Sequence, residues 1–159
     1  MCEAAAAKAR ELGFTPRILT TEMEGDSATE GLTFGRQLAA EHSGSPVALI
    51  AGGETTVTIH HTEGEGGPNQ EFALSAARAP LSPHQVVLSL DTDGTDGPTP
   101  LAGGLTDSST GERAQALGMD VTQALSTHDV SPLLRRLSDA VITGHTGTNV
   151  NDLKLGLSR

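Results

Sequence analysis

The stretch "QVVLSLDTDGTDGPTP", residues 85–100, decides the fold of this chain. Its first six residues form a short apolar run, which is typical of a buried β-strand. The residues after this run place Asp91, Asp93 and Asp96 among glycines and prolines. In α/β proteins, binding sites gather in the loops beyond the carboxyl ends of the strands. The stretch therefore predicts an α/β fold with a site at one edge of its sheet.

The rest of the chain alternates between helix-like and strand-like segments, and glycine-rich loops fall at strand ends. No repeat, low-complexity tract or linker interrupts this alternation. We therefore expect one layered α/β domain over residues 1–159, with helices flanking a mixed β-sheet and polar glycine-rich loops at the strand ends. Strands are expected over residues 17–20, 46–53, 55–61, 85–90, 140–144 and 153–157, and helical pieces over 3–12, 27–42, 69–79, 108–118 and 121–138.

Composition limits both the core and the partners. Only 36% of the residues are hydrophobic and 2% aromatic, so small aliphatic side chains must build the core around Phe14, Phe34 and Phe72. The net charge of -10 disfavours nucleic acid and anionic membranes as partners. No apolar stretch is long enough to span a bilayer. Cys2 is the only cysteine, which excludes an intrachain disulfide and favours a cytoplasmic location.

Four polar loops accompany the predicted strands. They read "AGGETTV", "GEGGPNQE", "DTDGTDGPT" and "HTGTNVND", at residues 51–57, 64–71, 91–99 and 145–152. Glycines in such loops let backbone N–H groups converge, and a nearby helix N-terminus adds partial positive charge. The loops therefore suit the anionic oxygens of a phosphate or a carboxylate.

Several common sites are excluded by spacing. A Walker loop needs a lysine after its glycines, and the only lysines, Lys8 and Lys154, lie elsewhere. In "GEGGPN", Asn69 takes the place of the last glycine of a dinucleotide fingerprint, so we expect no NAD. A calcium loop starting at Asp91 would need a glutamate where Ala102 stands.

Oxygen-based chemistry remains for the aspartates of the third loop, with three interpretations open. Asp93 and Asp96 could hold Mg²⁺ together with substrate phosphates. One of them could accept the proton of a substrate hydroxyl. Alternatively, both could pin neighbouring loops by hydrogen bonds, as aspartates in turns do.

Taken together and in order, the motifs "GGETTVT", "GG-x-NQE-x-AL", "DGTDGPT" and "TGTNVND" resemble the MOFRL domain. That domain forms the C-terminal part of class II glycerate 2-kinases, a family also named as tartrate-pathway hydroxypyruvate reductases. The resemblance implies a two-domain α/β enzyme that transfers phosphate from ATP to the 2-hydroxyl of D-glycerate. It also implies a divalent metal, Mg²⁺, and an active site in the cleft between the domains. An NAD-dependent reductase is disfavoured.

The resemblance also assigns residues by position. Asp93 and Asp96 become the candidate catalytic residues and the candidate metal ligands. Residues expected to bind substrate or phosphate are Glu54, Thr55, Asn69, Gln70, Glu71, Thr95, Thr148, Asn149, Asn151 and Asp152. Glycines expected to shape the loops are Gly52, Gly53, Gly66, Gly67, Gly94, Gly97 and Gly147.

The chain departs from the family pattern at three positions. Pro68 stands where the second motif usually has an arginine, which would bind a carboxylate or phosphate through two hydrogen bonds. Pro100 replaces an acidic residue, and His145 replaces a proline. The alternative function is therefore a degenerate, non-catalytic module that binds an anion or a partner.

The resemblance implies a larger N-terminal kinase domain with an essential lysine, and residues 1–159 are expected to match only the C-terminal domain. We therefore expect the isolated chain to be inactive and its partners to be that domain, D-glycerate and ATP. A homo-oligomer is a further expectation, since an exposed cleft face must be covered.

Overall fold

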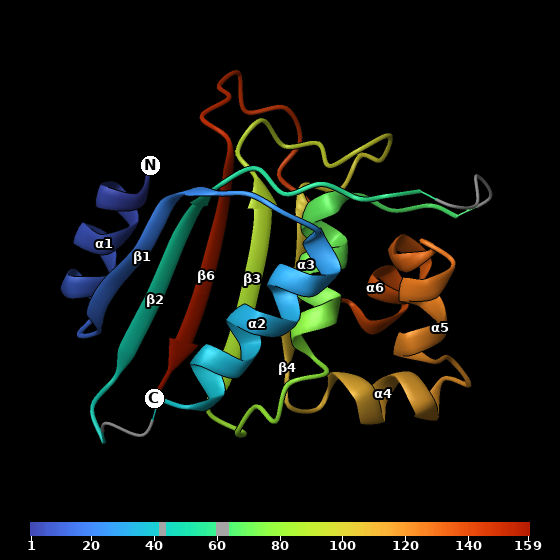
Figure 1. Ribbon diagram of the computed structural model, residues 1–159, viewed down its shortest axis with the longest axis horizontal. Helices are drawn as coiled ribbons and strands as arrows, with labels where there is room; N and C mark the ends of the chain where they lie inside the picture. The colour runs from blue at the N-terminus through green and yellow to red at the C-terminus, as the bar shows by residue number, and fades with distance from the viewer. Residues whose placement is uncertain (42–43, 60–63) are drawn as a thin grey trace.

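The structure is a computed structural model that describes residues 1–41, 44–59 and 64–159. Its described residues form a six-stranded mixed sheet with helices on both faces, which confirms the expected α/β fold (Figure 1). The elements are α1 (Cys2–Glu11), β1 (Thr15–Met23), α2 (Ser27–Ala39), β2 (Val47–Gly53), α3 (Pro68–Ala76), β3 (Gln85–Asp91), β4 (Gly103–Asp107), α4 (Thr110–Ala116), α5 (Val121–Ser126), α6 (Val130–Leu137), β5 (Ala140–Val141) and β6 (Asp152–Ser158).

The strand order β1-β2-β6-β3-β4-β5 determines where the loops meet. β1 and β2 are parallel, whereas β6 runs antiparallel to both β2 and β3. The carboxyl ends of β1, β2 and β3 therefore lie at the same edge of the sheet as the start of β6. In the register, Asp152 at the start of β6 pairs with both Gly53 and Asp91. We call this side of the sheet, with residues 24–26, 54–59, 64–67, 92–102 and 142–151, the loop edge.

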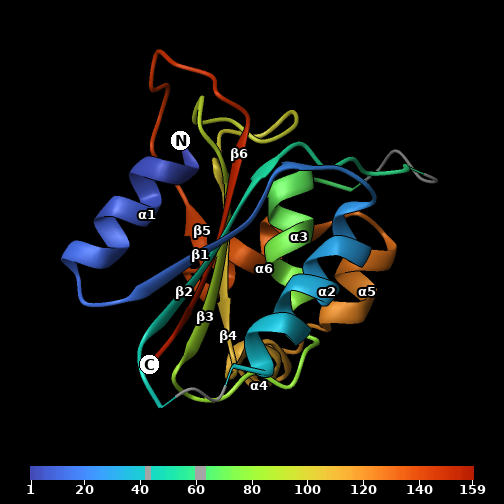
Figure 2. The ribbon, with the colours of Figure 1, turned by 60° about the vertical axis from the view of Figure 1, so that its left-hand side comes forward.

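Helices cover the two sheet faces unequally. α1 lies on one face, against β1 and β2, and its Cys2 and Ala6 pack on Ile50 (Figure 2). α2, α3 and the α4–α6 group lie on the opposite face. There Phe34 of α2 and Phe72 of α3 place their ring centroids 5.6 Å apart in the main core. Two of the three phenylalanines predicted for the core are thus fully buried.

Close packing of α2 on α3 depends on small residues. A Cβ at Gly31 would collide with the Phe72 carbonyl oxygen, and one at Gly35 would lie 2.8 Å from the Ala76 carbonyl oxygen. Glycine at these positions lets the two backbones touch. Backbone contact of this kind lets a chain with few aromatic side chains still form a tight core.

Two predicted strands need correction, and one strand was missed. Residues 55–59 of the predicted strand 55–61 form no strand, and residues 60–61 lie outside the described part of the chain. β2 ends at Gly53 because its partner β6 begins opposite that residue, so a longer strand would have no ladder on that side. The predicted strand 140–144 is only Ala140–Val141. β4 was missed because its glycines hide the strand pattern, and its pairing with β3 creates the strand.

Helix boundaries follow local signals more closely. Asp26 caps α2, since its Oδ1 accepts a hydrogen bond from the Thr29 backbone N–H at 2.9 Å. The helical stretch predicted over 121–138 is divided into α5 and α6 by a turn at His128, whose φ is +56°.

No helix in the described ranges is both long and apolar enough to cross a membrane.

Candidate functional site at the loop edge

The third and fourth loops are locked together at the loop edge. The Thr92 hydroxyl donates to the Asn151 carbonyl oxygen at 2.8 Å and accepts from the Val150 N–H at 2.9 Å. The Asp93 carbonyl oxygen accepts from the Thr146 N–H at 3.0 Å. Residues more than fifty positions apart in the sequence therefore form one surface.

Asp93 presents a carboxylate on this surface. Its Oδ1 accepts hydrogen bonds from the Thr95 backbone N–H at 2.8 Å and from the Thr95 hydroxyl at 2.9 Å. Its Oδ2 accepts from the Asn149 side-chain amide at 3.2 Å. The Thr95 bonds hold the pKa of Asp93 below its usual value. Asp93 is thus an ionised group at the junction of the two loops.

Asp96 has a different environment, because it is buried against the start of α3. Its two oxygens accept from the backbone N–H groups of Asn69 at 3.0 Å and Gln70 at 2.9 Å. The side-chain amides of the same two residues donate to it at 3.2 and 2.9 Å. Burial raises the pKa of Asp96, and these hydrogen bonds oppose the shift. The carboxylate therefore joins the third loop to α3, as the loop-pinning interpretation describes.

This capping changes what the start of α3 offers to a ligand. The free N–H groups of a first helical turn can bind an anion. Here the N–H groups of Asn69 and Gln70 are already paired with Asp96, and Pro68 has no N–H. Gly67 permits the arrangement, because a Cβ there would overlap the Asp96 carboxylate.

Lys154 lies beneath the loops and has no solvent exposure. Its Nζ donates to Asp152 Oδ2 at 2.7 Å and to Asn69 Oδ1 at 2.8 Å, and it lies 5.3 Å from the centroid of the Phe72 ring. The Ser89 hydroxyl donates to the same Asn69 oxygen at 2.6 Å. Burial lowers the pKa of Lys154, and the Asp152 charge opposes this shift. The ammonium thus joins β6 to α3.

Gln70 extends the same network toward α6. Its Nε2 donates to the Thr99 hydroxyl at 3.0 Å, and its Oε1 accepts from the Ser131 hydroxyl. Gln70 has no solvent exposure and Asn69 is 1% exposed. Both residues were predicted to bind substrate, and the structure places both inside the domain.

The carboxylates at the strand ends do not form a chelating cluster. Burial, with the charges of Asp152, Asp93 and Glu54, raises the pKa of Asp91. Across the described ranges, no three histidine, cysteine or acidic side chains converge to hold a metal ion. Asp96 is 1% exposed and its oxygens face α3, so Asp93 and Asp96 do not fit a shared metal site. Asp93 alone fits as a single carboxylate ligand.

The remaining predicted residues divide between surface and interior. Thr55 is buried and its Oγ1 accepts from the Ser27 hydroxyl at 2.9 Å, so it anchors α2. Glu54 lines a polar groove of about 540 Å³ together with Glu22, Glu24 and Asn151. Thr148, Asn149 and Asn151 are exposed on the fourth loop.

Glu71 lines a pocket of about 380 Å³ together with Pro68, Pro98 and several motif glycines. Its Oε1 lies 2.9 Å from Nδ1 of His128. Burial raises the pKa of Glu71, and the His128 hydrogen bond opposes the shift. Sequence reasoning missed His128, because no motif contains it and only the turn between α5 and α6 brings it to α3.

The family model of the MOFRL family matches residues 47–152. The chain belongs to the MOFRL family. This MOFRL domain is 44% identical to the glycerate 2-kinase of Pyrococcus horikoshii over 98% of its length, and 43% identical to the D-glycerate 2-kinase of Thermotoga maritima over 99%. A relative from Agrobacterium vitis, 40% identical over 96% of the chain, is named as a hydroxypyruvate reductase.

Solved structures agree with these relatives. The MOFRL domain matches the crystal structure of glycerate kinase from Thermotoga maritima with a TM-score of 0.93 and 40% identity over 99% of the chain. It matches a crystal structure from Pyrococcus horikoshii with a TM-score of 0.92 and 42% identity, also over 99% of the chain. The chain spans only 37% and 39% of the two kinases' lengths, so it corresponds to their smaller part.

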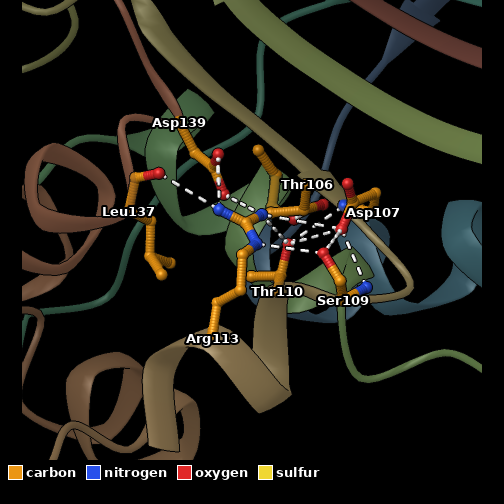
Figure 3. A network of polar contacts seen from close by, with 8 residues as sticks. Thr106, Asp107, Ser109, Thr110, Arg113, Leu137 and Asp139 are labelled. Atoms are coloured by element: carbon orange, nitrogen blue, oxygen red, sulfur yellow. Dashed lines mark hydrogen bonds and ion pairs between the residues drawn. The ribbon is translucent and has the colours of Figure 1, made fainter. Parts of the chain in front are cut away.

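The MOFRL domain carries a second charged cluster at the opposite edge of the sheet, where β4 ends (Figure 3). Arg113 of α4 donates to both carboxylate oxygens of Asp139, at 3.0 and 2.7 Å, and to the Leu137 carbonyl oxygen at 3.1 Å. Its guanidinium also lies 3.5 Å from Asp107. The cluster fastens α4 to the end of α6, and none of its residues belongs to a predicted motif.

Proposed function

We propose that this chain is the C-terminal domain of a glycerate 2-kinase, contributing loops to an interdomain site that transfers phosphate from ATP to the 2-hydroxyl of D-glycerate. The observation that carries the proposal is the convergence of the four motif loops at one sheet edge, in a domain 43–44% identical to two such kinases. Loops gathered beyond strand ends are where α/β enzymes bind their ligands.

The proposed contribution of this chain is positioning and charge. Phosphoryl transfer depends mainly on holding donor and acceptor in line and on neutralising the developing charge. Asp93 stays ionised at the junction of the third and fourth loops, with Asn149 beside it. Mg²⁺ commonly uses one or two carboxylates together with substrate phosphates, and Asp93 fits the role of such a ligand.

The buried residues of the motifs take a supporting role in this proposal. Asp96, Asn69, Gln70 and Lys154 hold the loop edge in shape through hydrogen bonds inside the domain. Their contribution to catalysis would be the fixed geometry of the loops that they connect.

A chimera provides the test. The chain replaces the matching region of the Thermotoga maritima D-glycerate 2-kinase, and formation of 2-phosphoglycerate from D-glycerate and ATP is measured. We expect an active chimera, no activity from the chain alone, and a loss of about a hundredfold in kcat on Asp93→Asn. A folded chimera without activity would favour a non-catalytic module.

A further inference from the structure

The pocket above Glu71 is built from segments that the motif assignment leaves apart. Its lining includes Val57 and Ile59, the prolines Pro68 and Pro98, and the side chains of Glu71 and His128. Its volume of about 380 Å³ lies at the small end of the range for metabolite sites. Most of its described lining residues are apolar or glycine, and among them Glu71 and His128 supply the polar side chains.

Glu71 offers one open hydrogen-bond acceptor to the pocket. Glu71 is 3% exposed, and its Oε1 is engaged with His128 Nδ1 at 2.9 Å. Within the described part of the chain, its Oε2 has no hydrogen-bond partner. In the described ranges, no side-chain nitrogen or oxygen is both sealed from solvent and without a partner, so Oε2 is open to water in the pocket. A ligand hydroxyl can donate to Oε2 in place of that water.

The walls of the pocket are fixed before any ligand arrives. The Glu65 N–H donates to Asp129 Oδ1 at 3.0 Å, and the Glu65 carbonyl oxygen accepts from the Ser131 N–H at 2.9 Å. The Glu65 carboxylate forms two hydrogen bonds with Arg135, at 2.8 and 2.6 Å. Segment 64–67 is therefore tied to the start of α6. A pre-formed wall reduces the ordering cost of binding.

The charges around the pocket select the kind of ligand. Neither lysine nor arginine lines it in the described part of the chain, and Arg135 is paired with Glu65. The first N–H groups of α3 are taken by Asp96. In the described part of the lining, a carboxylate or phosphate would meet the Glu71 carboxylate with no lysine or arginine beside it, and the His128 imidazole is already paired with Glu71. A hydroxyl would find an acceptor.

We propose that this pocket binds the uncharged, hydroxyl-bearing end of a small polyol, with one ligand hydroxyl donating to Glu71 Oε2 and the carbon skeleton lying against Pro68 and Pro98. Pro68 is the specificity-determining residue, because it gives this wall an apolar surface in place of a charge. The inference concerns binding by this chain alone and goes beyond phosphoryl transfer. If both proposals hold, the hydroxyl end of the acceptor enters here and its carboxylate stays outside.

Titration of the nitrogen-15-labelled chain with glycerol, followed by amide chemical shifts, tests the proposal. We expect saturable shifts confined to residues around the pocket, at 64–67, 71, 97 and 128. Glu71→Gln keeps the shape but weakens the acceptor, so the glycerol affinity should fall about tenfold. Glu22→Gln removes a carboxylate from the neighbouring groove and should leave the affinity unchanged. The amide spectra also show whether each variant is folded.

A second ligand and a second variant test the selectivity. Wild type should bind D-glycerate no more tightly than glycerol. Pro68→Arg should raise the affinity for D-glycerate about tenfold, because an arginine at this wall can pair with a carboxylate, and it should leave glycerol binding unchanged.

Three results would overturn the proposal: no saturable shift with glycerol, an unchanged affinity in folded Glu71→Gln, or tighter binding of D-glycerate than of glycerol by wild type. A Pro68→Arg variant that binds both ligands as wild type does would remove Pro68 from the site. Because binding is measured on the chain and phosphoryl transfer on the chimera, failure of one proposal is distinguishable from failure of the other.

Discussion

Two charged clusters hold this fold together at opposite edges of its sheet, and they differ in their access to water. At the loop edge, the side chains of the Lys154–Asp152 pair are 0% and 4% exposed. At the other edge, those of Arg113 and Asp107 are 34% and 40% exposed. Water stabilises an unpaired charge in the second cluster but not in the first. Breaking an ion pair should therefore cost much more folding stability at the loop edge than at the other edge.

The largest effect is expected from Lys154→Met. The variant leaves Asp152 buried without its ammonium and Asn69 Oδ1 without one of its donors, so the free energy of unfolding should fall by about 3–5 kcal/mol. Urea denaturation measures this change. The double variant Lys154→Met/Asp152→Asn should recover part of the loss, because it removes the orphaned charge. Strictly additive losses would show that the pair is not coupled.

Asp96→Ala should have the next largest effect. It leaves the buried N–H groups of Asn69 and Gln70 unpaired at the start of α3, which should cost about 2–4 kcal/mol of stability. Amide hydrogen exchange should show lost protection at the start of α3 and in the third loop. As a control, Asp93→Asn at the surface of the same loop should leave the protection of α3 as it is in wild type.

Asp139→Asn tests the partly exposed cluster. The variant weakens the paired hydrogen bonds with Arg113, and solvent can compensate the guanidinium, so about 1 kcal/mol or less of stability should be lost. Denaturation at low and high salt gives the measurement, and the loss should shrink in high salt. A loss as large as that of Lys154→Met would mean that exposure does not separate the two clusters.

The smallest expected effects are pH slopes of opposite sign at the two edges. The pKa of Glu71 is raised by burial above its ordinary value of 4.5, so the folded state holds its proton more tightly than the unfolded state does. The contribution of the protonated Glu71 carboxyl to the free energy of unfolding is fully present below pH 4.5, and it is lost as the pH rises through the folded pKa. Glu71→Gln should therefore gain stability relative to wild type as the pH rises toward neutrality.

Asp107 at the other edge should behave in the opposite way. Burial by itself raises its pKa, but hydrogen bonds from Ser109 and the charge of Arg113 outweigh burial and leave the pKa below 3.8. Its stabilising contribution is present above pH 3.8 and is lost as the pH falls through the folded pKa. Asp107→Asn should therefore lose stability relative to wild type over the same rise in pH. Parallel slopes for the two variants would contradict the comparison.

The sequence predicted strands and helices correctly where a short local pattern is enough to indicate the element. Apolar runs located β2 and β3, and a capping residue followed by helix formers located α2. It failed at β4, whose glycines form a strand only because β3 lies beside them. It also failed at residues 55–59, which have β-branched side chains but form only an isolated bridge between Thr56 and Asp26.

The candidate site shows the same division. The sequence identified Asp93 and Asp96 as a pair, yet tertiary contacts leave one at the surface and bury the other under α3. A lysine between leucines in "DLKLGL" was a usable signal, since a charged residue facing the core of a central strand needs a partner. His128 offered no such signal.

The sequence by itself determined the α/β class, the family and the four loops, because these depend on local periodicity and on motifs that are contiguous in the chain. Only the tertiary structure decided which motif residues face solvent and which residues from elsewhere join them. Strand order brings Asp152 beside both Gly53 and Asp91, and the turn at His128 brings an imidazole to Glu71. Burial and pairing are properties of distant segments in contact, and distance along the chain does not encode them.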